Sequence, residues 1–164
     1  MSATDEFLAA NARYVESFDK GDKPMPPAKQ VAVVACMDAR IETGRLLGLE
    51  EGDAHVIRNA GGVVTDDVIR SLAISQRLLG TREIVLIHHT DCGMLTFKDD
   101  AVKADIEADT GLRPPFALEA FADPAEDVKQ SMRRIANSPF VPHKDAVRGF
   151  VYHVETGRLE EVHA

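Results

Sequence analysis

The stretch VAVVACMDAR, residues 31–40, is the starting point for interpreting this chain. Its first five residues are apolar and rich in valine, which is typical of a strand buried on both faces of a parallel sheet. The apolar run stops at Cys36, and Asp38 and Arg40 follow at alternate positions. A buried strand that ends in a thiol, a carboxylate and a guanidinium indicates a chemical site, but this trio alone does not say which chemistry.

Strands and helices alternate around this stretch. The apolar patterns predict strands over 31–35, 54–57 and 83–88, and a C-terminal hairpin over 147–154 and 159–162. They predict helices over 43–47, 65–79, 97–109 and 123–137. This alternation predicts an α/β fold, with a mainly parallel central sheet flanked by helices and an antiparallel edge strand from the hairpin.

The N-terminal segment, residues 1–27, is predicted to form a projecting helical arm and a proline-rich linker. Thr4 can cap its helix, and apolar residues recur at helical spacing from Phe7 to Phe18. The glycine and prolines of 21–27 exclude regular structure there. Residues 28–164 are then one α/β domain, which suits a chain of 164 residues. The arm must bury its apolar stripe on its own body or on a second subunit.

The overall charge excludes some classes of partner. The chain carries 19 Lys and Arg against 27 Asp and Glu, a net charge of −8, which argues against nucleic acid and anionic membrane surfaces as partners. No apolar run approaches the roughly 20 residues that span a bilayer. The N-terminus lacks the basic and apolar regions of a signal peptide. We therefore expect a cytoplasmic protein.

The second of the two cysteines lies in HHTDCGM, residues 88–94, which also follows a predicted buried strand. Ligands of open parallel sheets bind at the carboxyl ends of the strands. If the two strands are neighbours, Cys36, Asp38, His89 and Cys92 converge on one point. Two thiolates, an imidazole and a carboxylate suit tetrahedral zinc.

The same residues allow other interpretations. Cys92 could be a nucleophile with His89 as its base, or Cys36 and Cys92 could form a redox pair, although they lack the C-x-x-C spacing. Both cysteines could also be ordinary buried residues. His88, the neighbour of His89, points to the opposite side of a strand and is predicted to be a hydrogen-bonded core histidine.

Four motifs in register from about residue 28 to 162 resemble the β-carbonic anhydrases. They are Cys36-Met-Asp38-Ala-Arg40, Arg58-Asn-Ala-Gly61, His89-Thr-Asp-Cys92-Gly93 and the hairpin Arg148-Gly-Phe…Thr156-Gly-Arg-Leu159. The first and third are most similar to a bacterial and fungal branch that also contains carbonyl sulfide hydrolases.

The resemblance implies one Zn²⁺ per chain, with Cys36, His89 and Cys92 as its protein ligands. It implies a lyase that reversibly hydrates CO2 to bicarbonate by zinc-bound hydroxide. In an active site Asp38 would pair with Arg40, and both would be catalytic; in a closed site Asp38 would be the fourth zinc ligand. Hydrolysis of carbonyl sulfide at the same zinc is the alternative, and a non-catalytic zinc-binding structural protein is a further one.

The resemblance also implies a homodimer or larger homo-oligomer, with the N-terminal helix reaching across to the second subunit. Arg58 is interpreted as a structural or interfacial cation, and Gly61-Gly62 as a tight turn that approaches the site. Some relatives close their site through a bicarbonate pocket that contains a tryptophan. This chain has no tryptophan, so we do not expect that regulation.

Overall fold

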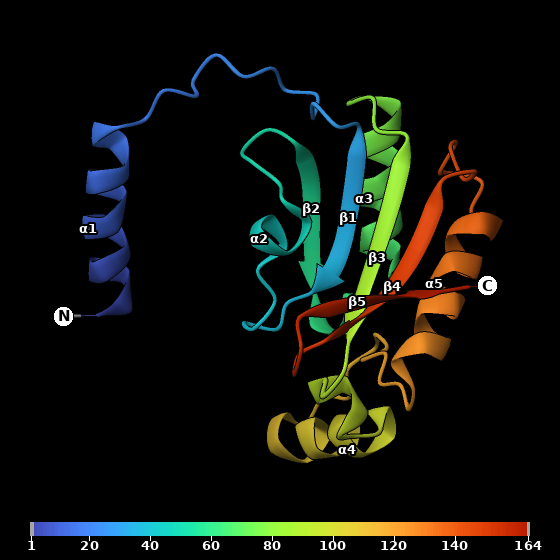
Figure 1. Ribbon diagram of the computed structural model, residues 1–164. Helices are drawn as coiled ribbons and strands as arrows, with labels where there is room; N and C mark the ends of the chain where they lie inside the picture. Colours follow the sequence, from blue (N-terminus) through green and yellow to red (C-terminus); the bar gives the residue numbers. More distant parts are fainter. Residues whose placement is uncertain (1, 164) are drawn as a thin grey trace.

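A five-stranded sheet forms the centre of the computed structural model, which describes residues 2–163 (Figure 1). The strands are β1 (Val31–Cys36), β2 (Ala54–Asn59), β3 (Glu83–His89), β4 (Val147–His153) and β5 (Arg158–Val162). Their order is β2-β1-β3-β4-β5. Strands β1 to β4 run parallel to one another, and β5 is antiparallel to β4. The predicted α/β fold with its antiparallel edge is confirmed.

Within residues 2–163 the structure contains five α-helices, of which α2, α3 and α5 pack on the sheet through apolar residues. The five helices are α1 (Ala3–Glu16), α2 (Thr43–Leu47), α3 (Asp66–Arg77), α4 (Asp99–Thr110) and α5 (Pro124–Asn137), with short 3-10 turns η1 (Ala60–Gly62) and η2 (Gly93–Leu95). Helices α3 and α5 cover one face (Figure 1), where Leu72 and Ile135 pack with Ala32 and Val34. The alternate residue Val33 packs on the other face with leucines that include Leu46 of α2. Strand β1 is therefore buried on both faces, as its apolar run predicts.

The register of β1 and β3 fixes where polar side chains emerge from the sheet. Val31 pairs with Glu83, and Ala35 pairs with Ile87. The two strands therefore end at nearly the same level. Helix α4 lies beyond these carboxyl ends (Figure 1).

Helix α1 stands apart from the sheet at the end of an extended linker (Figure 1). It begins two residues earlier than a Thr4 cap would place it, because Ser2 and Asp5 form a capping box in which each side chain bonds the other residue's backbone N–H. Thr4 is instead inside the first turn. None of the residues of α1 is buried.

Within residues 2–163, none of the helices is both long enough and apolar enough to cross a bilayer.

Candidate metal centre

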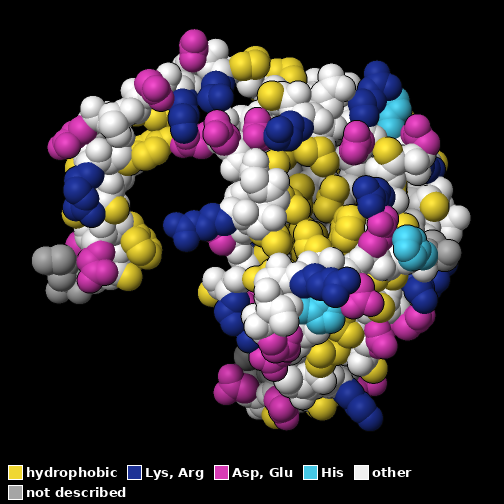
Figure 2. Space-filling model, viewed as in Figure 1, with side chains coloured by type: hydrophobic (Ala, Val, Ile, Leu, Met, Phe, Trp, Pro, Cys, Tyr) yellow, Lys and Arg dark blue, Asp and Glu magenta, His cyan; other side chains and the backbone are white. Residues whose placement is uncertain are grey.

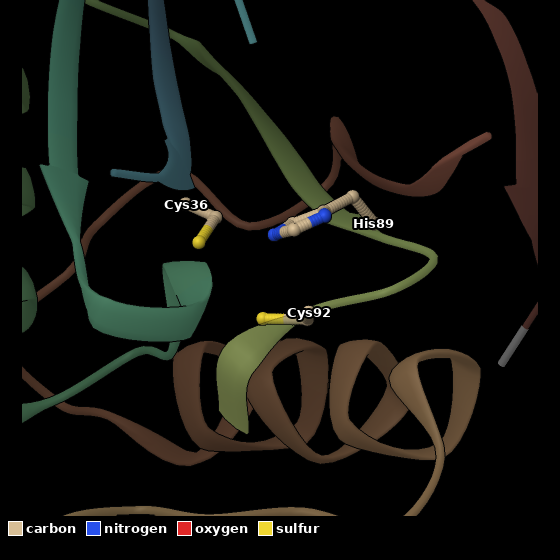
Figure 3. A group of neighbouring side chains, drawn as sticks. All are labelled: Cys36, His89 and Cys92. Atoms are coloured by element: carbon tan, nitrogen blue, oxygen red, sulfur yellow. The ribbon is translucent and has the colours of Figure 1, made fainter. Parts of the chain in front are cut away.

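Two neighbouring strands bring the three predicted metal ligands together. Cys36 is the last residue of β1, and His89 is the last residue of β3. The chain turns after His89 and presents Cys92 just before η2. Figure 3 shows the three side chains pointing toward a common centre. Their ligand atoms all lie within 4.8 Å of one another, and all three residues are buried.

The imidazole of His89 is oriented for metal binding. Its Nδ1 lies 2.8 Å from the Thr90 carbonyl oxygen, and a carbonyl can only accept, so Nδ1 carries the proton. In the neutral imidazole, Nε2 then carries the lone pair, and this buried atom has no hydrogen-bond partner within residues 2–163. A buried, unsatisfied nitrogen beside two sulfur atoms fits a tetrahedral zinc site.

The two thiols differ in acidity. Burial raises the pKa of Cys36, but the nearby imidazole of His89 and the backbone N–H groups of Asp38 and Gly61 outweigh it, and the pKa of Cys36 lies below its ordinary value. Burial raises the pKa of Cys92 to about 11; the Met94 N–H opposes this shift, and the negative charge of Cys36 adds to it. The first proton therefore leaves Cys36. A bound dication would favour thiolate at both positions.

Asp38 lies beside the ligands and is held by Arg40. Arg40 donates from Nε to Asp38 Oδ1 at 3.0 Å and from Nη2 to Oδ2 at 2.8 Å, and its backbone N–H reaches Oδ1 at 2.9 Å. These hydrogen bonds hold the pKa of Asp38 well below its usual range, and the bonds from the guanidinium make the largest contribution. Asp38 Oδ2 is also 3.7 Å from His89 Nε2. An ionised acceptor thus stands at the edge of the candidate metal site.

The predicted Gly61-Gly62 turn does approach the site closely. Gly62 has a φ of +70°, and a Cβ at this position would lie 2.8 Å from the Cys36 nitrogen and 2.9 Å from the Ile87 oxygen. Only glycine fits both the left-handed conformation and the available space. The turn therefore packs backbone directly against the ends of β1 and β3.

Arg58 has the structural role that the sequence suggested. It donates from Nε to the Cys36 carbonyl at 3.0 Å and from Nη2 to the Asp38 carbonyl at 2.7 Å. The end of β1 and the segment that follows it are therefore anchored from β2.

Sequence reasoning missed Asp91, which accepts a 2.7 Å hydrogen bond from Arg40 Nη1. Its position between His89 and Cys92 was the available signal.

His88 is a core histidine, as predicted. It is fully buried, and its Nε2 lies 2.6 Å from Asp127 Oδ2 on α5. His55 likewise bonds Ser75, with its Nδ1 2.8 Å from the hydroxyl oxygen. Neither belongs to the group of candidate metal ligands found within residues 2–163.

A cavity of about 550 Å³ leads to the two cysteines. Its walls are mainly apolar, and among the described residues that line it Asp38 is the one ionisable group besides the cysteines. Its apolar side chains include Met37, Met94, Phe97, Val102 and Leu118. A small, neutral molecule can approach the sulfur ligands along such a surface without losing strong contacts to water.

Comparison with known proteins identifies relatives along nearly the whole chain. The family model described as carbonic anhydrase matches residues 31–159. Beta-carbonic anhydrase 1 of Mycobacterium tuberculosis (strain ATCC 25618 / H37Rv) is 62% identical over 162 residues, which cover 99% of each chain.

A second relative and a solved structure extend this comparison. Carbon disulfide hydrolase of Acidianus sp. (strain A1-3) is 34% identical, over 95% of this chain and 89% of that protein. The crystal structure of a carbonic anhydrase from Streptococcus mutans superposes with a TM-score of 0.93 at 43% identity, and the match covers 99% of both chains.

Proposed function

This chain belongs to the β-carbonic anhydrase family, and we propose that it is a zinc enzyme that reversibly hydrates CO2. Cys36, His89 and Cys92 would hold one Zn²⁺ per chain. The observation that carries this proposal is the buried group of three ligand atoms within 4.8 Å, in which His89 Nε2 has no other partner within residues 2–163.

The donor set agrees with zinc and with the reaction. When bound, zinc acts as a Lewis acid and lowers the pKa of a coordinated water from about 16 to about 7 in favourable sites. In the overall reaction a water oxygen bonds to the carbon of CO2, one C=O π bond breaks, and one proton passes to the buffer.

Asp38 would orient the water that reacts. Arg40 keeps its carboxylate ionised, so Asp38 can accept a hydrogen bond from a molecule seated beside the ligands. If Asp38 separates from Arg40, its carboxylate can bind the metal instead and close the site. The Asp38–Arg40 pair would therefore decide whether substrate has access.

The apolar cavity favours linear, neutral substrates such as CO2 and carbonyl sulfide. Hydrolysis of carbonyl sulfide at the same site is our second candidate function. It is supported by the relatives named carbon disulfide hydrolase, such as the one from Acidianus.

Kinetics and metal analysis of the purified protein test these functions. We expect about one zinc per chain and stopped-flow CO2 hydration that is lost in His89→Gln. The matched control His153→Gln, which changes a hairpin histidine paired with Glu160, should retain both. Sulfide release from carbonyl sulfide with negligible CO2 hydration would replace the first function by the second, and zinc binding without either turnover would leave a structural role.

We also propose that the enzyme is at least a dimer, assembled through the arm. Phe7, Leu8 and Val15 of α1 are each more than 60% exposed. Figure 2 shows hydrophobic side chains on the inner side of the arm and over the β1–β3 region of the body, with a gap between them. A second copy can fill that gap with its own arm, which would bury both apolar surfaces.

The cytoplasmic location expected from the sequence stays a prediction.

A further inference from the structure

We propose that Asp91 is a positioning residue, which holds Arg40 against Asp38 from the opposite metal-ligand loop. Asp91 lies between His89 and Cys92, on the turn after β3. It accepts a 2.7 Å bond from Arg40 Nη1 at Oδ2 and a 2.9 Å bond from Arg40 Nη2 at its carbonyl oxygen. This inference rests on the proposed function, because Asp38 and Arg40 act in the same site.

The contacts of Arg40 with its two partners are compatible with each other. Asp38 takes the Nε hydrogen and one Nη2 hydrogen, whereas Asp91 takes an Nη1 hydrogen and the other Nη2 hydrogen. The guanidinium is a rigid planar group with five donors. Each contact therefore restrains the same plane, and formation of one favours formation of the other.

Arg40 needs this second restraint. Its side chain is 47% exposed, and a long exposed side chain has many competing rotamers. Asp38 is only two residues away, so their contact restrains Arg40 within its own loop. Asp91 instead belongs to the loop of His89 and Cys92. The bond from Arg40 to Asp91 therefore connects the two loops that carry the ligands.

The backbone of Asp91 is adapted to this contact. Its φ is +52°, in the left-handed region, which aspartate and asparagine tolerate better than most other residues. In this conformation both its carbonyl oxygen and its carboxylate reach Arg40. Strained backbone conformations of this kind concentrate at functional sites.

The carboxylate of Asp91 is 73% exposed, so solvent screens its charge and the effect of removing it should be moderate. Asp91→Asn removes the charge but keeps the shape of the side chain. Asparagine also tolerates the left-handed φ, so the hydrogen bond from Arg40 to the backbone carbonyl should remain. We expect kcat/KM for CO2 hydration to fall about two- to fivefold, the size of an exposed ion pair. Asp67→Asn is the matched control, since Asp67 is 72% exposed and pairs with Arg70 instead of Arg40.

The deciding measurement is the side-chain 15Nε–1Hε NMR signal of Arg40 in the zinc-loaded protein, assigned with Arg40→Lys. We expect faster hydrogen exchange and a lower order parameter for Arg40 in Asp91→Asn, but wild-type values in Asp67→Asn. In an Arg40→Ala background, Asp91→Asn should lower kcat/KM no further, because Asp91 acts through Arg40.

If the order parameter and hydrogen-exchange rate of Arg40 were the same in wild type and Asp91→Asn, the inference would be overturned. A loss of order with unchanged kcat/KM would overturn it too. The NMR comparison requires no turnover: if the wild-type protein binds zinc but does not hydrate CO2, the proposed function fails, and the restraint on Arg40 is still decided separately.

Discussion

Cys36 and Cys92 are close in space but differ in electrostatic environment. The backbone N–H groups of Asp38 and Gly61 point at Cys36, whereas burial dominates at Cys92. A single thiolate therefore forms first at Cys36, and its charge opposes a second thiolate at Cys92. This asymmetry predicts different reactivity once the metal is removed.

We expect iodoacetamide to alkylate Cys36 of the metal-stripped protein at least about tenfold faster than Cys92 at pH 8, because the thiolate is the nucleophile. The Cys36 rate should level off with rising pH well before the Cys92 rate, which should keep increasing toward pH 11 since its pKa is about 11. Peptide mass spectrometry measures both rates. Zinc should protect both residues, and faster labelling of Cys92 would contradict the assignment.

The site could be predicted residue by residue only in part. Cys36, His89 and Cys92 each follow a recognisable apolar strand, so the sequence predicts that they meet if the two strands are neighbours. The contact of Asp91 with Arg40 could not, because it depends on a φ of +52° and on residues 51 positions apart. No sequence pattern around an aspartate in a turn predicts which side chain will be its hydrogen-bond partner.

At the scale of the element, Asp99 connects helix α4 to the wall of the cavity. Its carboxylate accepts hydrogen bonds from the backbone N–H groups of Leu118, Glu119 and Ala120 at 2.8, 3.1 and 2.9 Å. Glu119 has a φ of +66°, and Leu118 lines the cavity. One side chain thus holds a strained loop beside the site.

We expect Asp99→Asn to lower the free energy of unfolding by about 1 kcal/mol at pH 7, because it weakens charge-assisted hydrogen bonds. Burial raises the pKa of Asp99, but the three N–H donors lower it more, so its pKa is below the ordinary value. The ionised form therefore stabilises the fold above about pH 4, and this stabilisation is lost as the pH falls further.

Urea denaturation at pH 7 and pH 3, at fixed protein concentration, measures this effect. The difference between wild type and Asp99→Asn should shrink at pH 3. Asp100→Asn is the control, since Asp100 is 95% exposed and, within residues 2–163, its side chain bonds only Arg113. A loss of unfolding free energy as large as that of Asp99→Asn would contradict the role of the loop contacts.

The boundaries of the elements differ slightly from those predicted from the sequence. Strand β1 extends to Cys36, which pairs with Asn59, although the apolar pattern ends at Ala35. Helix α4 begins at Asp99 rather than at residue 97. Local pattern identifies an element, but hydrogen bonds with neighbouring elements decide its last residues.

At the scale of the whole molecule, the N-terminal arm makes little contact with the rest of its own chain, and none of the residues of α1 is buried. We expect the double substitution Phe7→Ser and Leu8→Ser to raise the dimer dissociation constant by about 100-fold or more, because each large apolar side chain contributes roughly 1.5–3 kcal/mol when buried and each dimer has two arms. Analytical ultracentrifugation measures the constant. Phe140→Ser, which removes an equally exposed aromatic residue from the body, should leave it unchanged, and an unaltered dimer in the arm variant would exclude this mode of assembly.

The sequence by itself determined the class of the fold and the candidate residues at the strand ends, because strand and helix periodicities and the residues at strand ends are local. Only the tertiary structure decided that β1 and β3 are neighbours in a register that brings Cys36 and His89 to one level. It also decided that Arg40 is shared between Asp38 and Asp91, and that Asp99 holds the cavity wall. These contacts join segments far apart in the chain, and they exist only after the sheet has aligned its strands.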